Sequence, residues 1–213
     1  MYYHASPVGG IRQLEPRISN HGVPLIYFSR KRENVLVYLS NAIEKYCRET
    51  GFVHQGPWQK WGPYGFDRDG IQRLEEYYPD ALIKTYKGVS GYIYGAKSIR
   101  EAAFDLHIPD AAVSRDPVPV HSVEFVPDAY EAILQAERAG LLRIMRYEQM
   151  PERMREWNRK TIREEYETNL DHPEYRHFLK GNFADILSDS QPMRTATNEG
   201  DSAKKNQEEG TLA

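Results

Sequence analysis

YHAS at residues 3–6 and LIYFS at residues 25–29 are two short stretches rich in aromatic and apolar side chains. Such side chains favour β-strands, so we predict one strand over residues 1–6 and a second over residues 25–29. The stretch between them, residues 9–24, contains several glycines and prolines and is typical of a surface loop. The chain is therefore expected to begin with strand, loop and strand.

An amphipathic helix is predicted directly after the second strand. Apolar residues recur at helical spacing from about residue 31 to residue 48, and charged residues occupy the other face. Ser29 is the expected N-cap and Gly51 the expected end of this helix. Cys47 is the single cysteine of the chain and lies on the apolar face, so it cannot form an internal disulfide and is expected to be a core thiol.

Further strands and helices are predicted downstream. GYIYG at residues 91–95 is typical of a buried strand bounded by glycines, and residues 122–126 predict another strand. Asp128 is expected to open a helix that breaks at Gly140. Residues 150–169 are highly charged and predict a further helix. Its expected buried stripe consists of Met154, Trp157, Ile162 and Tyr166.

The middle and the end of the chain differ in composition from the predicted strands and helices. Residues 56–66 combine turn formers with aromatic rings and are expected to be irregular but ordered, and residues 74–87 are expected to be helical in part, with Pro79 as an interruption. Beyond Leu187 the composition is typical of a solvated tail. We therefore predict one domain over residues 1–187 and a disordered tail over residues 188–213.

Composition narrows the class of protein. The chain has 213 residues, 40% of them apolar, which suffices for one sizeable core. A net charge of −3 and a pI near 6.2 argue against a nucleic-acid partner, because binding phosphates requires clustered Lys and Arg. No stretch approaches the roughly 20 apolar residues of a membrane helix. A cytoplasmic protein with no membrane partner is expected.

Several common site motifs are missing from the sequence. It contains no GxGxxG, no Walker loop, no HExxH, no paired CxxC and no GxSxG. A Rossmann, P-loop, zincin or zinc-ribbon site and an esterase nucleophile elbow therefore have no local support. No metal is expected.

The order of the short motifs resembles the ADP-ribosyltransferase superfamily in its His-Tyr-acid branch, most nearly the rifampin ADP-ribosyltransferase type. The resemblance covers residues 2–126 in pieces. Its pieces are the first strand with YHAS, the IYFS strand and the helix that follows it, the GYIY strand, and the SRDP turn at residues 114–117. It implies an α+β fold with a split β-sheet core, here joined to a largely helical C-terminal half.

The resemblance also implies a reaction. Members of this superfamily use NAD as a substrate, release nicotinamide and transfer ADP-ribose to an acceptor, which makes them glycosyltransferases that need no metal. The bond to nicotinamide breaks through an oxocarbenium-like ribosyl cation, so the site must hold the carboxamide, orient the riboses and offer negative charge. The acceptor of this chain is not indicated by any local pattern.

Site residues follow from the same resemblance. His4 would bond the ribose hydroxyls, the backbone at Ala5 would clasp the carboxamide, Ser6 would add a hydroxyl contact, and Tyr27 would stack on the nicotinamide ring. Ala5 stands where the family usually has glycine, so its methyl group could crowd the carboxamide. From the residues themselves, Arg12 in the first loop, like Arg17, could pair with the pyrophosphate.

The acid that would stabilise the ribosyl cation has several candidates. Asp105 is the first and Glu101 the second, because both follow the GYIY strand; Glu124 on a later strand is a further alternative.

Other interpretations remain open at this point. His4 could be a structural histidine that bonds a backbone carbonyl, and the block from Trp58 to Tyr86 could add specificity or only cover the sheet. One rival function is a non-catalytic nucleotide-binding or protein-interaction module of the same fold. Another is a helical partner protein that presents residues 152–166 as a charged face, so a protein partner could bind through the C-terminal helices.

Overall fold

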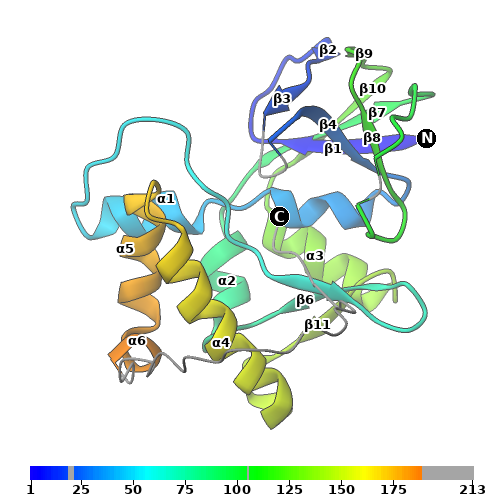
Figure 1. Ribbon diagram of the computed structural model, residues 1–213. Coiled ribbons are helices and arrows are strands. Elements are labelled where there is room, and N and C mark those ends of the chain that lie inside the picture. The colour runs from blue at the N-terminus through cyan, green and yellow to red at the C-terminus, as the bar shows by residue number, and fades with distance from the viewer. Residues whose placement is uncertain (19–21, 105, 189–213) are drawn as a thin grey trace, which may run out of the picture.

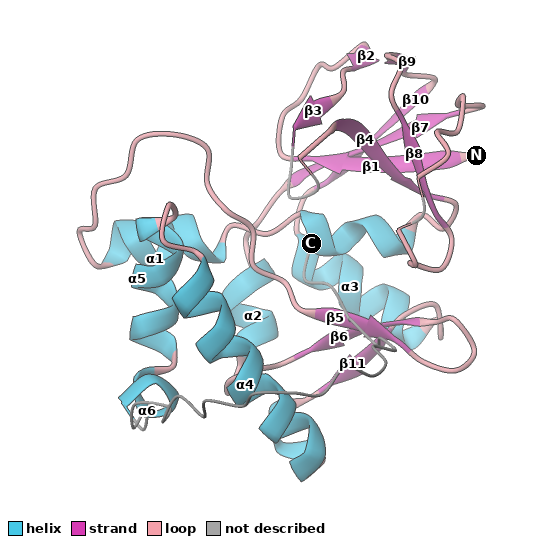
Figure 2. Ribbon diagram, viewed as in Figure 1, coloured by secondary structure: helices cyan, strands magenta, loops and turns pink. Residues whose placement is uncertain are grey.

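The structure is a computed structural model, and it describes residues 1–18, 22–104 and 106–188. It combines helices with mainly antiparallel sheets, so the predicted α+β class is confirmed. Figure 1 shows the strands of the largest sheet together at the upper right and most helices at the lower left, and Figure 2 shows the same division by colour. The predicted tail from residue 189 onward lies outside the described residues.

A six-stranded sheet contains the four strands predicted from the sequence. Its order is β10-β7-β1-β4-β3, and β8 pairs with β4. The strands are β1 (Tyr2–Ser6), β3 (Arg17–Ile18), β4 (Pro24–Ser29), β7 (Gly91–Ala96), β8 (Ala111–Ser114) and β10 (Ser122–Val126). β1 pairs with β7 over five positions but with β4 only at Tyr3 and Ser29. Strands β1 and β4 therefore pair at one position only, near the start of β1 and at the end of β4.

Two smaller sheets were not predicted. The first has the order β11-β6-β5, with β5 (Tyr64–Phe66), β6 (Gln72–Glu75) and β11 (Arg143–Met145). The second joins β2 (Gln13–Leu14) to β9 (Val118–Pro119), so the expected loop over residues 9–24 in fact contains two short strands, β2 and β3. Residues 74–87 likewise divide into the end of β6 and the helix α2 (Ala81–Tyr86). Pairing with a distant strand overrides the local pattern at β2, which pairs with β9, and at β6, which pairs with β11, whereas the helix α2 agrees with the expectation that residues 74–87 are helical in part.

The prediction of a single helix over residues 31–48 is wrong. The structure has a 3₁₀ helix η1 (Glu33–Tyr38), a break, and then α1 (Ala42–Glu49). At the break Leu39 leaves helical geometry and is 1% exposed in the core, and the Ser40 carbonyl accepts a hydrogen bond of 2.8 Å from Lys60 Nζ. Ser29 caps no helix; its hydroxyl accepts from the Lys31 amide at 3.1 Å. Cys47 is buried, as predicted.

The C-terminal half is largely helical, as predicted. It contains α3 (Ala129–Arg138), η2 (Tyr147–Gln149), α4 (Glu152–Thr168), α5 (Pro173–Asn182) and α6 (Ala184–Ser188). The Asp128 carboxylate accepts from the amides of Tyr130 and Glu131 and so caps α3. On α4, Ile162 is fully buried, but Trp157 is 47% exposed and does not belong to the buried stripe. Among the described residues, no helix is long and apolar enough to span a bilayer.

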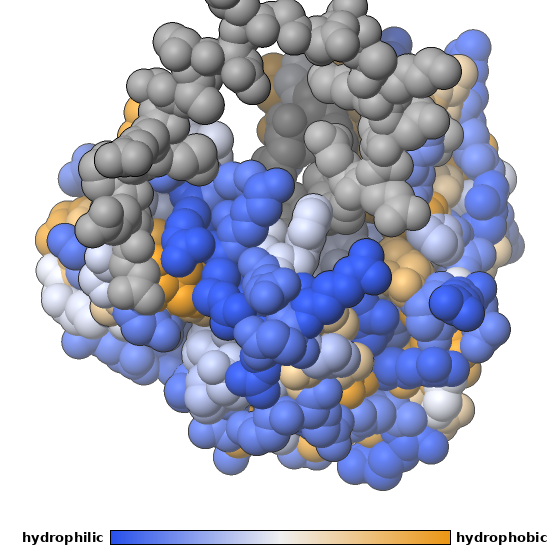
Figure 3. All heavy atoms as spheres, turned by 60° about the horizontal axis from the view of Figure 1, so that its bottom comes forward, coloured by the Kyte–Doolittle hydropathy of each residue, from blue (hydrophilic) through white to orange (hydrophobic). Residues whose placement is uncertain are grey.

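Apolar side chains form three clusters. One lies between the six-stranded sheet and the three-stranded sheet and is centred on η1 and α3. A second joins α1, α2, α4 and α5 around Trp61, and a third covers the opposite face of the large sheet. The face that comes forward when the bottom of Figure 1 is turned toward the viewer is mostly hydrophilic (Figure 3). The sheets and the helical half therefore each have an apolar cluster of their own, with the second cluster centred on Trp61.

Candidate functional site

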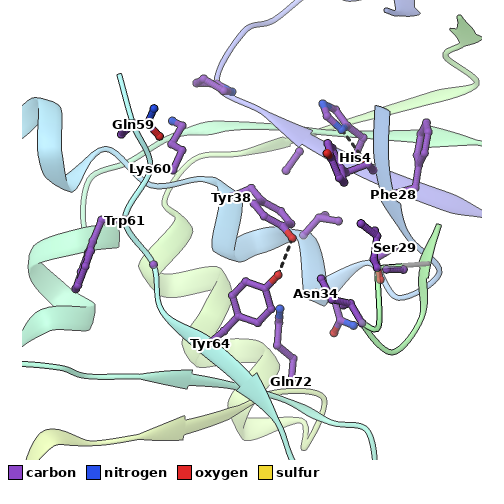
Figure 4. A pocket seen from close by; sticks show the side chains of 18 of the residues that line it. His4, Phe28, Ser29, Asn34, Tyr38, Gln59, Lys60, Trp61, Tyr64 and Gln72 are labelled. Carbon is purple, nitrogen blue, oxygen red and sulfur yellow. Dashed lines mark hydrogen bonds between the residues drawn. The ribbon is translucent and has the colours of Figure 1, made fainter. Parts of the chain in front are cut away.

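A cavity of about 370 Å³ lies between the six-stranded and the three-stranded sheet. Strands β1 and β4 form one wall, and β5 and β6 form the facing wall. η1, the segments 58–62 and 106–111, and the facing parts of α4 and α5 complete the enclosure. Figure 4 shows His4 on the upper side of this space and Tyr64 with Gln72 on the lower side.

His4 is held in one orientation by a backbone contact. Its Nδ1 lies 2.9 Å from the Tyr27 carbonyl oxygen, and since a carbonyl can only accept, Nδ1 carries the proton. Burial lowers the pKa of His4 below its usual range; the bond to Tyr27 opposes this shift and the charge of Arg17 adds to it. The imidazole is therefore neutral at pH 7, and its Nε2 is a hydrogen-bond acceptor.

Two further predicted residues line the same cavity. Ala5 and Tyr27 are both in its wall, beside His4. Ala5 lies in the regular part of β1, opposite Ile93, so its backbone is extended and alanine adopts it without strain. The structure thus brings His4, Ala5 and Tyr27 together from strands that are about twenty residues apart in the chain.

Ser6, Arg12 and Arg17 are the other residues predicted to contact NAD, and they are not among the described residues that line the cavity. The Ser6 hydroxyl accepts a hydrogen bond from the Val8 amide at 3.2 Å. Arg12 precedes β2, and its carbonyl accepts from the Val120 amide at 2.9 Å. The positive charge of Arg17 contributes to the lowered pKa of His4.

The candidate acids are placed as follows. Glu101 accepts hydrogen bonds from the Tyr2 hydroxyl at 2.6 Å and from Arg30 at 2.7 Å, and it does not line the cavity. The hydrogen bonds from Tyr2 and Arg30 hold the pKa of Glu101 below its usual range. Glu124 is paired with Arg32, also away from the cavity. Asp105 lies outside the described residues.

Among the residues that the structure describes, the carboxylate that lines the cavity is Glu165 on α4. Its Oε2 accepts a hydrogen bond of 2.8 Å from the side-chain Nδ2 of Asn169, and Asn169 also lines the cavity. Sequence reasoning missed Glu165 because charged residues surround it on α4. A signal was present, since Glu165 follows the buried Ile162 by three positions and therefore shares its inward face.

Several aromatic side chains and one lysine also line the cavity. Tyr38 comes from η1, and Lys60, Trp61 and Tyr64 come from the block that begins at Trp58. The hydroxyls of Tyr38 and Tyr64 are 3.0 Å apart, and burial raises the pKa of both phenols, so both stay protonated at neutral pH. Lys60 Nζ donates to the Ser40 carbonyl, and burial lowers the pKa of Lys60. Trp61 is 2% exposed and rests on Phe178 with ring centroids 5.2 Å apart. Residues of this block therefore line the cavity, and Trp61 also packs against the helical half.

Two buried amides complete the wall and were also missed. Asn34 on η1 is 4% exposed and Gln72 on β6 is 2% exposed, and both line the cavity. Polar residues at inward positions of an apolar pattern are the signal that could have identified them, because Asn34 lies one 3₁₀ turn before the buried Val37 and Gln72 shares its strand face with Leu74.

The described residues contain no group of three or more His, Cys, Asp or Glu arranged to hold a metal ion. Comparison of the chain with protein-family models, with curated proteins and with solved structures finds no match. Conclusions about function therefore depend on the cavity and on the side chains that line it.

Proposed function

We propose that this chain binds NAD in the cavity and transfers ADP-ribose to an acceptor with release of nicotinamide, on a fold of the ADP-ribosyltransferase type. The observation that carries the proposal is the convergence of His4, Ala5 and Tyr27 on one cavity. The resemblance implies an NAD contact for each of the three, and they come from two motifs that are separate in the chain, YHAS and IYFS.

The local geometry suits the roles that the resemblance implies. His4 Nε2 can accept a hydrogen bond from a ribose hydroxyl, because Nδ1 is already committed to Tyr27. The ladder between β1 and β4 ends at Tyr3, so β4 takes no further ladder hydrogen bonds from Ala5. The backbone there is suited to clasp a carboxamide, and the Tyr27 ring lies in the same wall to stack on the nicotinamide.

The proposed reaction requires negative charge near the ribosyl cation and positive charge near the pyrophosphate. When the glycosidic bond breaks, its electron pair leaves with the nicotinamide nitrogen and the ribosyl carbon becomes cationic; the acceptor then bonds to that carbon and loses a proton. Glu165 can stabilise the cation through the negative charge that it brings to the cavity. Lys60 in the wall can supply positive charge for the pyrophosphate.

Nicotinamide release tests this proposal. The purified chain is incubated with NAD, and free nicotinamide is quantified by chromatography for the wild type, His4→Ala and Val123→Ala. Val123 is 52% exposed on β10 and serves as the control. Release by the wild type and the control, with loss in His4→Ala, supports a transferase or NAD glycohydrolase site at His4. The absence of release from NAD in the presence of candidate acceptors contradicts it.

A second function is favoured by one observation. Neither Glu101 nor Glu124, two of the predicted acids, lines the cavity among the described residues. A non-catalytic nucleotide-binding module would retain the His4 wall without an acid beside the ribosyl carbon. Saturable NAD binding that is lost in His4→Ala, without any nicotinamide release, would select this function over the transferase.

A further inference from the structure

Two side-chain amides line the cavity with hydrogen-bonding atoms that have no partner. Neither Nδ2 nor Oδ1 of Asn34 has one in the described part of the chain, and neither has Oε1 of Gln72. Both residues are more than nine-tenths buried. Buried polar atoms are almost always hydrogen-bonded in folded proteins, and because Asn34 and Gln72 also line a cavity, a ligand in that cavity can supply the partners that these atoms lack.

The positions of these amides are fixed by the fold. Asn34 reaches into the cavity from η1, where the next two residues, Val35 and Leu36, are buried in the core. Gln72 reaches in from β6, where it pairs with Phe66 of β5. Figure 4 shows the two amides pointing into the space beside the Tyr64 ring, away from His4.

The chemistry of the two amides defines the class of ligand. An asparagine side chain that offers its N–H and its C=O together makes a bidentate pair with any planar group that has an acceptor beside a donor, as the edges of nucleobases do. Gln72 Oε1 adds one more acceptor. The rings of Tyr64 and Phe66, also in the wall, offer faces for stacking. Because both amides are uncharged, they favour an uncharged group.

We propose that Asn34 and Gln72 form a subsite for the hydrogen-bonding edge of a nucleobase. The base is either the adenine of NAD or a base of the acceptor, and both sources present the same chemistry to the amides. The subsite deepens the proposed function, since it would fix one end of the dinucleotide or the acceptor. Occupation of the subsite does not depend on the transfer reaction.

The test measures equilibrium binding of four probes by titration calorimetry: NAD, nicotinamide mononucleotide, adenosine and uridine, the last with and without saturating NAD. The variants are Asn34→Leu and Gln72→Met, which keep side-chain size and remove the amide. Asn158→Leu is the matched control, because Asn158 is also a buried amide with an unpartnered Oδ1 but does not line the cavity. Thermal melting confirms that each variant is folded.

Bidentate base contacts of this kind lead us to expect about tenfold weaker binding or more in Asn34→Leu. If the base is adenine, NAD and adenosine bind more weakly and nicotinamide mononucleotide binds as before. If the base belongs to the acceptor, uridine binds more weakly and NAD binds as before. A smaller loss in the same probes is expected for Gln72→Met, and none for Asn158→Leu.

Three results would overturn the subsite. These are the absence of adenosine and uridine binding to the wild type, unchanged binding of every probe in both variants, and equal weakening of nicotinamide mononucleotide and NAD. The proposed function fails separately, because nucleoside binding at Asn34 can be present when no nicotinamide is released. Conversely, nicotinamide release with unchanged binding in Asn34→Leu and Gln72→Met overturns the subsite alone.

Discussion

The Nδ1 atom of His4 lies 2.9 Å from the carbonyl oxygen of Tyr27, and this hydrogen bond links β1 to β4 beyond the single pair, Tyr3 and Ser29, of their ladder. The side chain thus joins two strands at the point where their backbones no longer pair. This contact fits the interpretation of His4 as a structural histidine. It also fixes the tautomer that a ribose-binding histidine needs, so the structural and the functional role are compatible in one residue.

The stability of the fold should depend on pH through His4. Burial lowers its folded pKa below the unfolded value of 6.5, so the unfolded state takes up a proton first as the pH falls. The free energy of unfolding should therefore decrease from about pH 6.5 down to the lowered folded pKa and change little above pH 6.5 on account of this group. Urea unfolding at about pH 7.5 and about pH 5 measures this decrease.

His4→Gln isolates the contribution of this one histidine. The variant keeps a side-chain N–H for the Tyr27 carbonyl but does not titrate, so its loss of stability between the two pH values should be smaller than that of the wild type. An equal loss in both proteins would show that the His4 pKa is not lowered by folding.

Glu165→Gln should slow nicotinamide release while NAD affinity stays close to that of the wild type. Removal of one charge that stabilises a transition state typically costs about 100-fold in turnover. The matched control is Glu152→Gln, also on α4, where the exposed carboxylate pairs with Arg159 and should not affect turnover. Steady-state release at saturating NAD measures the effect.

Asp105→Asn in the same assay compares the acid of the cavity with the acid predicted from the motif. Full activity in Glu165→Gln would contradict a role for Glu165, and loss of turnover in Asp105→Asn alone would place the acid at the position expected from the resemblance.

Phe178→Ala should destabilise the fold by about 3–5 kcal/mol, the usual cost of deleting a buried aromatic ring. Phe178 is 1% exposed and contacts Trp61 and Tyr46, with ring centroids 5.2 and 5.8 Å away. Trp157→Ala removes a ring that is 47% exposed and should destabilise the fold clearly less than Phe178→Ala. Urea unfolding of both variants measures the difference, and similar values for the two would contradict the packing described for α5.

Four of the six strands of the large sheet were predictable because their signals are local. β1, β4, β7 and β10 each combine aromatic or β-branched residues with flanking glycines, prolines or polar turns. The cap at Asp128 is local as well, because it depends on a side chain and the two amides that follow it. Such signals need no knowledge of the rest of the chain.

The three-stranded sheet was not predictable because its pairing is distant. β6 and β11 pair Leu74 with Ile144, seventy residues later, and strands of three or four residues have too few positions to show a period. A distant contact also lies at the break between η1 and α1, where Lys60 donates a hydrogen bond to the Ser40 carbonyl. The cavity therefore combines a wall that the sequence motifs predict, at His4 and Tyr27, with a wall that only the tertiary structure reveals.

Titration of NAD into the wild type, His4→Ala and Val123→Ala by calorimetry is the most direct measurement of whether this cavity binds the dinucleotide. Saturable binding to the wild type and to Val123→Ala, with binding to His4→Ala lost or weakened by about tenfold or more, is the predicted result. No binding to the wild type at millimolar NAD, or equal binding to wild type and His4→Ala, would contradict an NAD site at the first strand.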